Sequence, residues 1–189
     1  MSELVVNQNK KIHPHKFALW LGIASIVMMF GGLTSAYIVK GNMPGWSTVE
    51  LPIHFYYSTF IILVSSLTMI LAKKAFASRQ MRKYKTLITL TAVLGVIFVV
   101  LQALGFSYLF SKGVTFEGTA GAGQFLYVIF SLHALHIVGG VIALIVLFLR
   151  SFNQKTRYYN IVPVELVGTY WHFVDILWIY LLVFFLITG

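Results

Sequence analysis

Five long apolar runs alternate with short polar stretches along the chain. The runs span residues 17–39, 53–72, 86–110, 124–149 and 164–188. Each is at least as long as the roughly 20 residues that an α-helix rising about 1.5 Å per residue needs to cross the hydrocarbon core of a bilayer. Lipid offers no hydrogen bonds to an open backbone, so such runs are expected to be helical. The pattern therefore predicts an all-α membrane protein, a bundle of five transmembrane helices.

The basic residues lie in alternate loops of this pattern. All but two of the 14 lysines and arginines fall in the N-terminal tail and in the loops after the second and fourth runs; the other two are Lys40 and Lys112. Loops rich in Lys and Arg stay in the cytoplasm. We therefore expect residues 1–16 to be a polar cytoplasmic tail and residues 17–189 a single five-helix transmembrane domain with an extracytoplasmic C-terminus. The net charge of +9 then reflects topology and not a nucleic-acid partner.

Composition excludes several kinds of site. The chain is 59% hydrophobic and has no cysteine, which removes thiolate metal sites, iron–sulfur clusters and disulfides. It contains no phosphate-binding loop, no nucleophile–base pair and no paired-carboxylate signature. No catalytic, cofactor-binding or metal-binding residue is therefore predicted.

Small residues indicate where helices could approach one another. Residues four apart share a helix face, and close approach through small side chains drives helix association in lipid. Gly140 lies on a histidine-bearing face, where we expect a tight crossing, and Gln102 is expected to form a hydrogen bond between helices. The candidate packing stripes are Gly31 with Ser35, Gly32 with Ala36, and Gly139 with Ala143.

The apolar runs also contain ionisable residues, which are costly in a membrane unless they are paired. Glu165, His172 and Asp175 form one stripe on the fifth run, and His133 and His136 lie on the fourth. Counting about 1.5 Å per residue from the cytoplasmic side puts Asp175 at roughly 16 Å and His136 at roughly 20 Å depth. These two residues are therefore the expected pair between the fourth and fifth helices.

Three interpretations of this polar cluster remain. It is a satisfied network that fixes how the fourth and fifth helices dock, a partial proton path, or a haem site. Haem would need two histidines that face one iron from opposite helices at matched depth. His133 and His136 share a helix, and His172 lies about 8 Å away in depth from the nearer of them, so the spacing disfavours an axial pair.

Several motifs resemble subunit III of the haem–copper oxidases. "HALHIVGG" at residues 133–140, followed by "ELVGTYWHFVDILW" at residues 165–178, carries the resemblance. "LGVIFVVLQA" at residues 94–103 and "GAGQFLYVIFSLH" at residues 121–133 are also similar to that family. The likeness extends from Phe17 to Gly189.

The resemblance implies a helical subunit of an oxidase in which haem and copper are held by partner subunits. This chain would carry no cofactor, would pack against the catalytic subunit I and other oxidase subunits, and would contact membrane lipid. The family's polar motifs then include Glu165, His172, Asp175, His133 and His136, with a structural or proton-supporting role.

The sequence departs from many members of that family in two ways. Many members have seven helices and hold lipid in a cleft between the first two and the remaining five. This chain resembles a shorter form with only the last five, so bound phospholipid in such a cleft would require a partner to supply the missing pair. Many members also carry a buried glutamate where "GIASIVMMFGG" places Ile26, so a proton role of that glutamate does not transfer.

The expected function is that of a non-catalytic subunit III of a cytochrome c or quinol oxidase. It would brace subunit I and support its proton uptake during oxygen reduction coupled to proton pumping. The alternatives are a haem-b transmembrane electron carrier and a small proton-coupled transporter, although the repeats and broken helices typical of transporters are not evident. The absence of a long targeting peptide favours the bacterial inner membrane.

Overall fold

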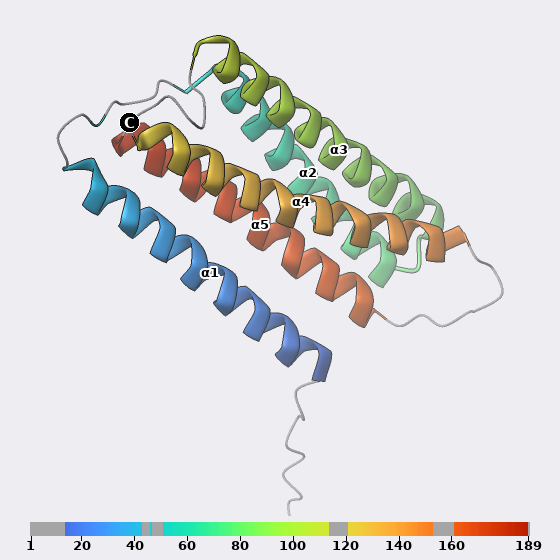
Figure 1. Cartoon of the computed structure of the whole chain (residues 1–189). Helices are drawn as coiled ribbons and strands as arrows, with labels where there is room; N and C mark the ends of the chain where they lie inside the picture. The colour runs from blue at the N-terminus through green and yellow to red at the C-terminus, as the bar shows by residue number, and fades with distance from the viewer. Residues whose placement is uncertain (1–13, 43–45, 47–50, 114–120, 153–160, 189) are drawn as a thin grey trace, which may run out of the picture.

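Five helices make up the described part of the chain in the computed structural model (Figure 1). The structure describes residues 14–42, 46, 51–113, 121–152 and 161–188. Each helix is long and apolar enough to cross a membrane, which confirms the predicted all-α fold with five membrane-spanning helices. The helices are α1 Pro14–Gly41, α2 His54–Ala77, α3 Met81–Ser111, α4 Ala122–Phe152 and α5 Val162–Thr188.

The helices continue beyond the apolar runs that predict them. α3 begins at Met81 instead of residue 86 and includes Arg82, Lys83 and Lys85. Lysine and arginine are good helix formers, and their long side chains reach water from a helix end, so hydropathy underestimates the helix length. α1 begins at Pro14, so the end of the predicted tail is helical; residues 1–13 lie outside the described residues.

The last four helices form a ring. α2 packs against α3 and α5, and α4 packs against the same two helices. α1 lies along the outside of α4 and α5, as Figure 1 shows, and over the described ranges it contacts neither α2 nor α3. α4 and α5 therefore each touch three of the other four helices.

A tight turn joins α2 to α3 and makes them antiparallel neighbours. The backbone N–H of Gln80 donates to the carbonyl oxygen of Ala75 at 2.9 Å, and that of Arg79 donates to Phe76 at 3.0 Å. Arg79 has a φ of 57°, the left-handed conformation that ends many helices. This pair of bonds is the Schellman motif, which satisfies the last carbonyls of α2 without a glycine.

Glycines do permit close helix contacts, but mostly not at the predicted stripes. A Cβ on Gly140 would lie 3.0 Å from the indole of Trp171, which confirms the tight crossing of α4 and α5. Gly31 and Gly32 of α1 have nothing within 4 Å in the described part of the chain, so the two stripes on α1 are wrong as contacts within this bundle. A spacing of four residues shows that two residues lie on the same face of a helix. It does not show whether that face packs against another helix.

The α1 face that does pack carries larger side chains. Its buried residues are Ile23, Phe30, Thr34 and Tyr37, which recur at helical spacing. Among the described residues Gly139 likewise meets only the hydroxyl of Tyr170, at 3.9 Å, so the third predicted stripe makes no tight contact there.

Candidate functional site

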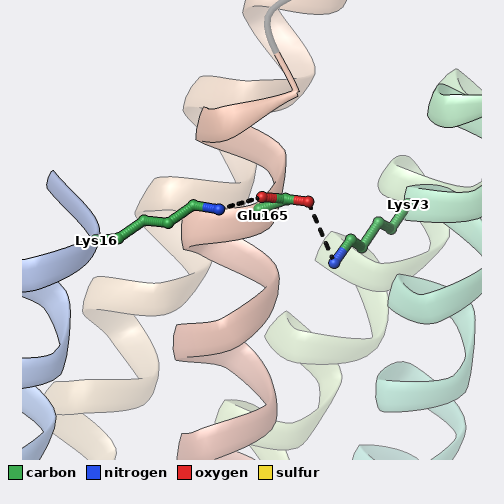
Figure 2. Close-up of polar contacts among 3 residues, drawn as sticks. All are labelled: Lys16, Lys73 and Glu165. Carbon is green, nitrogen blue, oxygen red and sulfur yellow. Dashed lines mark hydrogen bonds and ion pairs between the residues drawn. The ribbon is translucent and has the colours of Figure 1, made fainter. Parts of the chain in front are cut away.

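Glu165 links three helices at one end of the bundle. Its Oε2 lies 2.7 Å from Nζ of Lys16 in α1, and its Oε1 lies 3.6 Å from Nζ of Lys73 in α2 (Figure 2). The Glu165 side chain is 25% exposed, while those of Lys16 and Lys73 are 42% and 48% exposed. We call these three residues the Glu165 clasp. It brings together α1 and α2, which do not otherwise touch among the described residues.

The sequence did not identify the two lysines as partners of Glu165. Lys16 lies in the basic N-terminal tail and Lys73 in the basic loop after the second apolar run, both of which are expected in the cytoplasm. The signal that could have found them is depth, because Lys16, Lys73 and Glu165 all fall at the same expected membrane face. Three charges of both signs at one level are expected to pair.

A second polar link joins α1 to α5 near the other end of both helices. Oγ1 of Thr34 and the hydroxyl of Tyr180 share a hydrogen bond of 2.9 Å. Thr34 also bonds to the carbonyl oxygen of Phe30 in its own helix, at 3.0 Å. With the clasp at one end and this bond at the other, α1 runs parallel to α5 and is held at both ends.

His172 and Asp175 lie on the side of α5 that faces α2. Nδ1 of His172 and Oγ of Ser66 share a hydrogen bond of 2.7 Å. Asp175 is 2% exposed, and neither of its carboxyl oxygens has a hydrogen-bond partner among the described residues. The Ser66 hydroxyl is close enough to interact with that carboxyl, but its well-formed hydrogen bond is to His172.

His136 faces a different neighbour. Its Nδ1 donates to the carbonyl oxygen of Leu132 in its own helix at 2.6 Å, and its ring lies 5.8 Å from that of Phe30 in α1. The predicted hydrogen bond between Asp175 and His136 is therefore wrong. The helices are neighbours, but the depth count gives position along the helix and not direction around it, and the two side chains point towards α2 and α1 respectively.

His133 lies in an aromatic environment inside the bundle. Its ring is stacked on Trp178 at 5.3 Å, and the rings of Phe30 and Phe98 approach it edge-on. It is 1% exposed, and neither ring nitrogen has a hydrogen-bond partner within the described ranges. The five predicted site residues thus do not form one hydrogen-bonded network.

Hydroxyl groups of α2 supply polar contacts between helices, of which the sequence predicts only the one made by Gln102. Towards α3, Nε2 of Gln102 donates to Oγ of Ser58 at 2.9 Å, which confirms the predicted role of Gln102 between helices. Oγ1 of Thr68 and Oγ1 of Thr91 share a bond of 2.8 Å. All four residues are buried.

The same face of α2 also bonds to α5. Nε1 of Trp178 donates to Oγ1 of Thr59 at 2.9 Å, and Nε1 of Trp171 donates to Oγ of Ser65 at 3.2 Å. We call the contributing residues of α2 the hydroxyl seam, namely Ser58, Thr59, Ser65, Ser66 and Thr68. A signal for it exists in the sequence, since Ser58 and Ser65, and Thr59 and Ser66, are seven residues apart on one helix face.

The described residues contain no group of three or more His, Asp or Glu side chains placed to hold a metal ion. His133 and His172 also do not form an axial pair for haem, because His133 is enclosed by rings while His172 lines a groove between α2 and α5. The geometry is that of a helix bundle whose polar groups act between helices.

The chain matches known proteins over nearly its whole length. Residues 15–189 match the family described as cytochrome c oxidase subunit III. The cytochrome c oxidase subunit 3 of Bacillus sp. (strain PS3) is 26% identical over 167 residues, which cover 86% of this chain and 80% of that protein. A probable cytochrome c oxidase subunit 3 of Mycobacterium tuberculosis (strain ATCC 25618 / H37Rv) is 30% identical over 166 residues, which cover 85% and 80% of the two chains.

A longer relative combines two subunits in one chain. The heme-copper oxidase subunit I+III of Aeropyrum pernix is 30% identical over 171 residues, which cover 85% of this chain and 21% of that protein.

Proposed function

The chain belongs to the cytochrome c oxidase subunit III family, and on that premise we propose that it is a non-catalytic subunit that braces the catalytic subunit I and supports its proton uptake. Membership makes it part of a haem–copper terminal oxidase complex in respiratory electron transport. The observation that carries the proposal is the family match over residues 15–189, which spans the five helices. The relatives do not favour the alternative haem-b carrier or transporter.

The fused relative supports subunit I as the direct partner. A chain named subunit I+III joins both subunits in one polypeptide and so fixes their ratio. Such a fusion supports the interpretation that the two subunits act together. We place the haem and copper of the complex in the partner subunits, because His133 is stacked on a ring, His136 bonds to its own helix and His172 bonds to Ser66.

We propose that the N-terminus is cytoplasmic and that the membrane is the bacterial plasma membrane. The alternation of basic loops supports the orientation, and bacterial relatives support the location. In this orientation the Glu165 clasp lies at the cytoplasmic face, the face from which an oxidase takes up protons.

The bracing role rests on how α5 is held. The clasp fixes its first turn to α1 and α2, the hydroxyl seam binds Trp171 and Trp178, and Thr34 binds Tyr180. A helix anchored on several sides keeps its outer surface in a constant position. Such a surface can hold the proton-entry region of a neighbouring subunit in place.

Asp175 is the residue through which structural and proton-supporting roles can be separated. It is buried and unpaired among the described residues, yet it lies beside the Ser66–His172 bond. A structural role needs only a polar group of this shape, whereas a proton-supporting role needs a group that can lose a proton.

The test compares Asp175→Leu and Asp175→Asn in the assembled oxidase, with Ile176→Leu as the control, because Ile176 is the outward-facing neighbour and 65% exposed. We measure assembly, turnover and the number of turnovers before inactivation. A structural role predicts that Leu impairs assembly and Asn does not; a proton-supporting role predicts that both variants assemble but inactivate early. Normal assembly, turnover and lifetime in both variants would contradict either role.

A further inference from the structure

The carboxyl group of Asp175 lies inside the bundle without an ionic partner. Of the two carboxyl side chains in the described ranges, Glu165 lies beside two lysines, whereas neither oxygen of Asp175 has a hydrogen-bond partner there. Asp175 is 2% exposed. A carboxylate ion in a membrane segment is costly unless it is paired, and a protonated carboxyl group avoids that cost. Asp175 is therefore a group that holds a proton inside the bundle.

A groove of about 400 Å³ opens between α2 and α5 at the end of the bundle where the Glu165 clasp lies. Near that end it is lined by Lys73, Lys74 and Glu165. His172 lines it about 10 Å further along α5 than Glu165. The volume has room for several water molecules, and the charged groups at its end favour their presence. The groove therefore brings water to the ring of His172, whereas Asp175 does not line it.

The hydroxyl group of Ser66 connects the wall of this groove to the buried carboxyl group. Its Oγ shares a hydrogen bond of 2.7 Å with Nδ1 of His172, which leaves Nε2 of that ring for water in the groove. The same hydroxyl is close enough to Asp175 to interact with its carboxyl group. A carboxyl group, a hydroxyl group and an imidazole ring can each give and accept a proton. These three groups lie in order from Asp175 to the groove.

The charged groups and histidines that the neighbouring helices turn towards α5 lie elsewhere. They are Lys16 of α1, Lys73 and Lys74 of α2, and His133 and His136 of α4. The lysines lie at the level of Glu165, about 15 Å along α5 from Asp175, and the histidines contact aromatic rings. Among the described residues, Ser66 is therefore the group through which a proton can reach or leave Asp175.

We propose that Ser66 and His172 form a proton relay between Asp175 and the water of the groove. In the loaded state the Asp175 carboxyl group donates to Oγ of Ser66, Ser66 donates to Nδ1 of His172, and Nε2–H of the ring donates to water. On release the carboxyl proton passes to Oγ, the Ser66 proton passes to Nδ1, and the Nε2 proton passes to the water. One proton leaves, Asp175 becomes a carboxylate, and Ser66 and the ring stay neutral. The hydrogen bonds then point from Nδ1–H through Ser66 to the carboxylate.

The relay ends at Asp175. The sequence from Ile176 to Gly189 contains no charged residue and no histidine, so Asp175 stores a proton and does not pass it across the membrane. The use of this store rests on the proposed function, in which the chain supports the proton uptake of subunit I from the same face. The relay is tested by the exchange of one proton, whereas bracing is tested by assembly and turnover lifetime. Failure of one is therefore distinguishable from failure of the other.

The experiment follows the exchange of the Asp175 proton in the purified oxidase complex by infrared spectroscopy. The C=O band of a protonated carboxyl group shifts when the complex is transferred from water to heavy water. The difference between the unmodified complex and Asp175→Asn assigns the band, and Asp175→Glu, which moves the band instead of removing it, gives a second assignment. We expect this band to shift before the backbone amides of the helices exchange, because the relay needs no opening of the bundle.

Ser66→Ala interrupts the relay without changing any charge. We expect it to slow exchange of the Asp175 proton about tenfold or more, because exchange then requires local opening of the bundle. Ser66→Thr keeps the hydroxyl group and should stay within about twofold of the unmodified rate. Ser65→Ala is the matched control, because it removes a neighbouring hydroxyl group that bonds to Trp171 of α5. Loosened packing alone speeds exchange, so this control should exchange no more slowly than the unmodified complex.

Each of three results would overturn the relay. Absence of the assigned band would show that Asp175 holds no proton. Exchange of the carboxyl proton together with the backbone amides would show that water reaches Asp175 only when the bundle opens. Equal rates in the unmodified complex and in Ser66→Ala would show that the proton leaves by another route. The first two results do not depend on Ser66→Ala, so they stand whether or not that variant assembles.

Discussion

The indole of Trp171 in α5 lies directly against Gly95 in α3. A Cβ on Gly95 would stand 2.7 Å from Cη2 of Trp171 and 3.0 Å from Cγ2 of Val141, closer than packed carbon atoms approach. Gly140 borders the other side of the same ring. Trp171 is completely buried, and its Nε1 donates to Ser65 of α2. One side chain of α5 thus contacts all three other helices of the ring.

This contact predicts that Gly95→Ala destabilises the bundle. The added methyl group forces the indole or Val141 to move, a cost of about 1–3 kcal/mol for overpacking, reduced by up to about 1 kcal/mol because alanine favours a helix more than glycine does. The free energy of unfolding is measured in mild detergent with increasing dodecyl sulfate. Gly32→Ala is the matched control, since no neighbouring atom of the described part of the chain lies within 4 Å of its Cβ position, and it should be neutral or stabilising. Equal stability of the two variants would refute the contact.

The Glu165 clasp predicts unequal coupling of Glu165 to its two lysines. A double-mutant cycle with Lys16→Gln and Glu165→Gln should give a larger coupling free energy than one with Lys73→Gln, because the distances are 2.7 Å and 3.6 Å. Each coupling should be no more than about 1 kcal/mol, since both lysines are more than a third exposed, and should fall with added salt. Stronger coupling to Lys73 would contradict the arrangement in Figure 2.

The hydroxyl seam predicts a cost for removing Ser58. Ser58→Ala leaves Nε2 of the buried Gln102 without its partner, and hydrogen bonds between membrane helices contribute about 0.6 kcal/mol on average and up to about 1.7 kcal/mol. Ser107→Ala is the control, because Ser107 is exposed and its hydroxyl donates within its own helix, to the carbonyl oxygen of Ala103. If unfolding in dodecyl sulfate shows the same loss in both variants, the Gln102–Ser58 bond does not hold α3 to α2.

The apolar pattern predicted the helices well because a membrane imposes a minimum length on every span. It also predicted Gln102 and Gly140, where one polar or one small residue stands out against apolar neighbours. Helix ends were less predictable. The start of α3 at Met81 depends on lysine and arginine side chains that are helical but not apolar, so a hydropathy criterion misses them.

Partners across helices could not be predicted from spacing alone. The depths of Asp175 and His136 are compatible, but their directions around the two helices depend on how all five helices pack, and they face α2 and α1. The predicted packing stripes at Gly31 and Gly32 are wrong for the same reason. Small residues indicate a surface that another helix can approach closely, but they do not show which helix packs there. The pairing of Glu165 with Lys16 combines residues from opposite ends of the sequence, and only the docking of α1 on α5 brings them together.

We expect this chain to brace a redox subunit while haem and copper are held by that partner. The direct measurement is purification of the tagged chain in mild detergent, followed by quantification of haem, copper and co-purifying subunits before and after the complex is dissociated. We expect a large subunit with haem and copper to accompany the chain at a fixed ratio and to keep both when the two separate. Stoichiometric haem or copper that stays with the separated chain would contradict it.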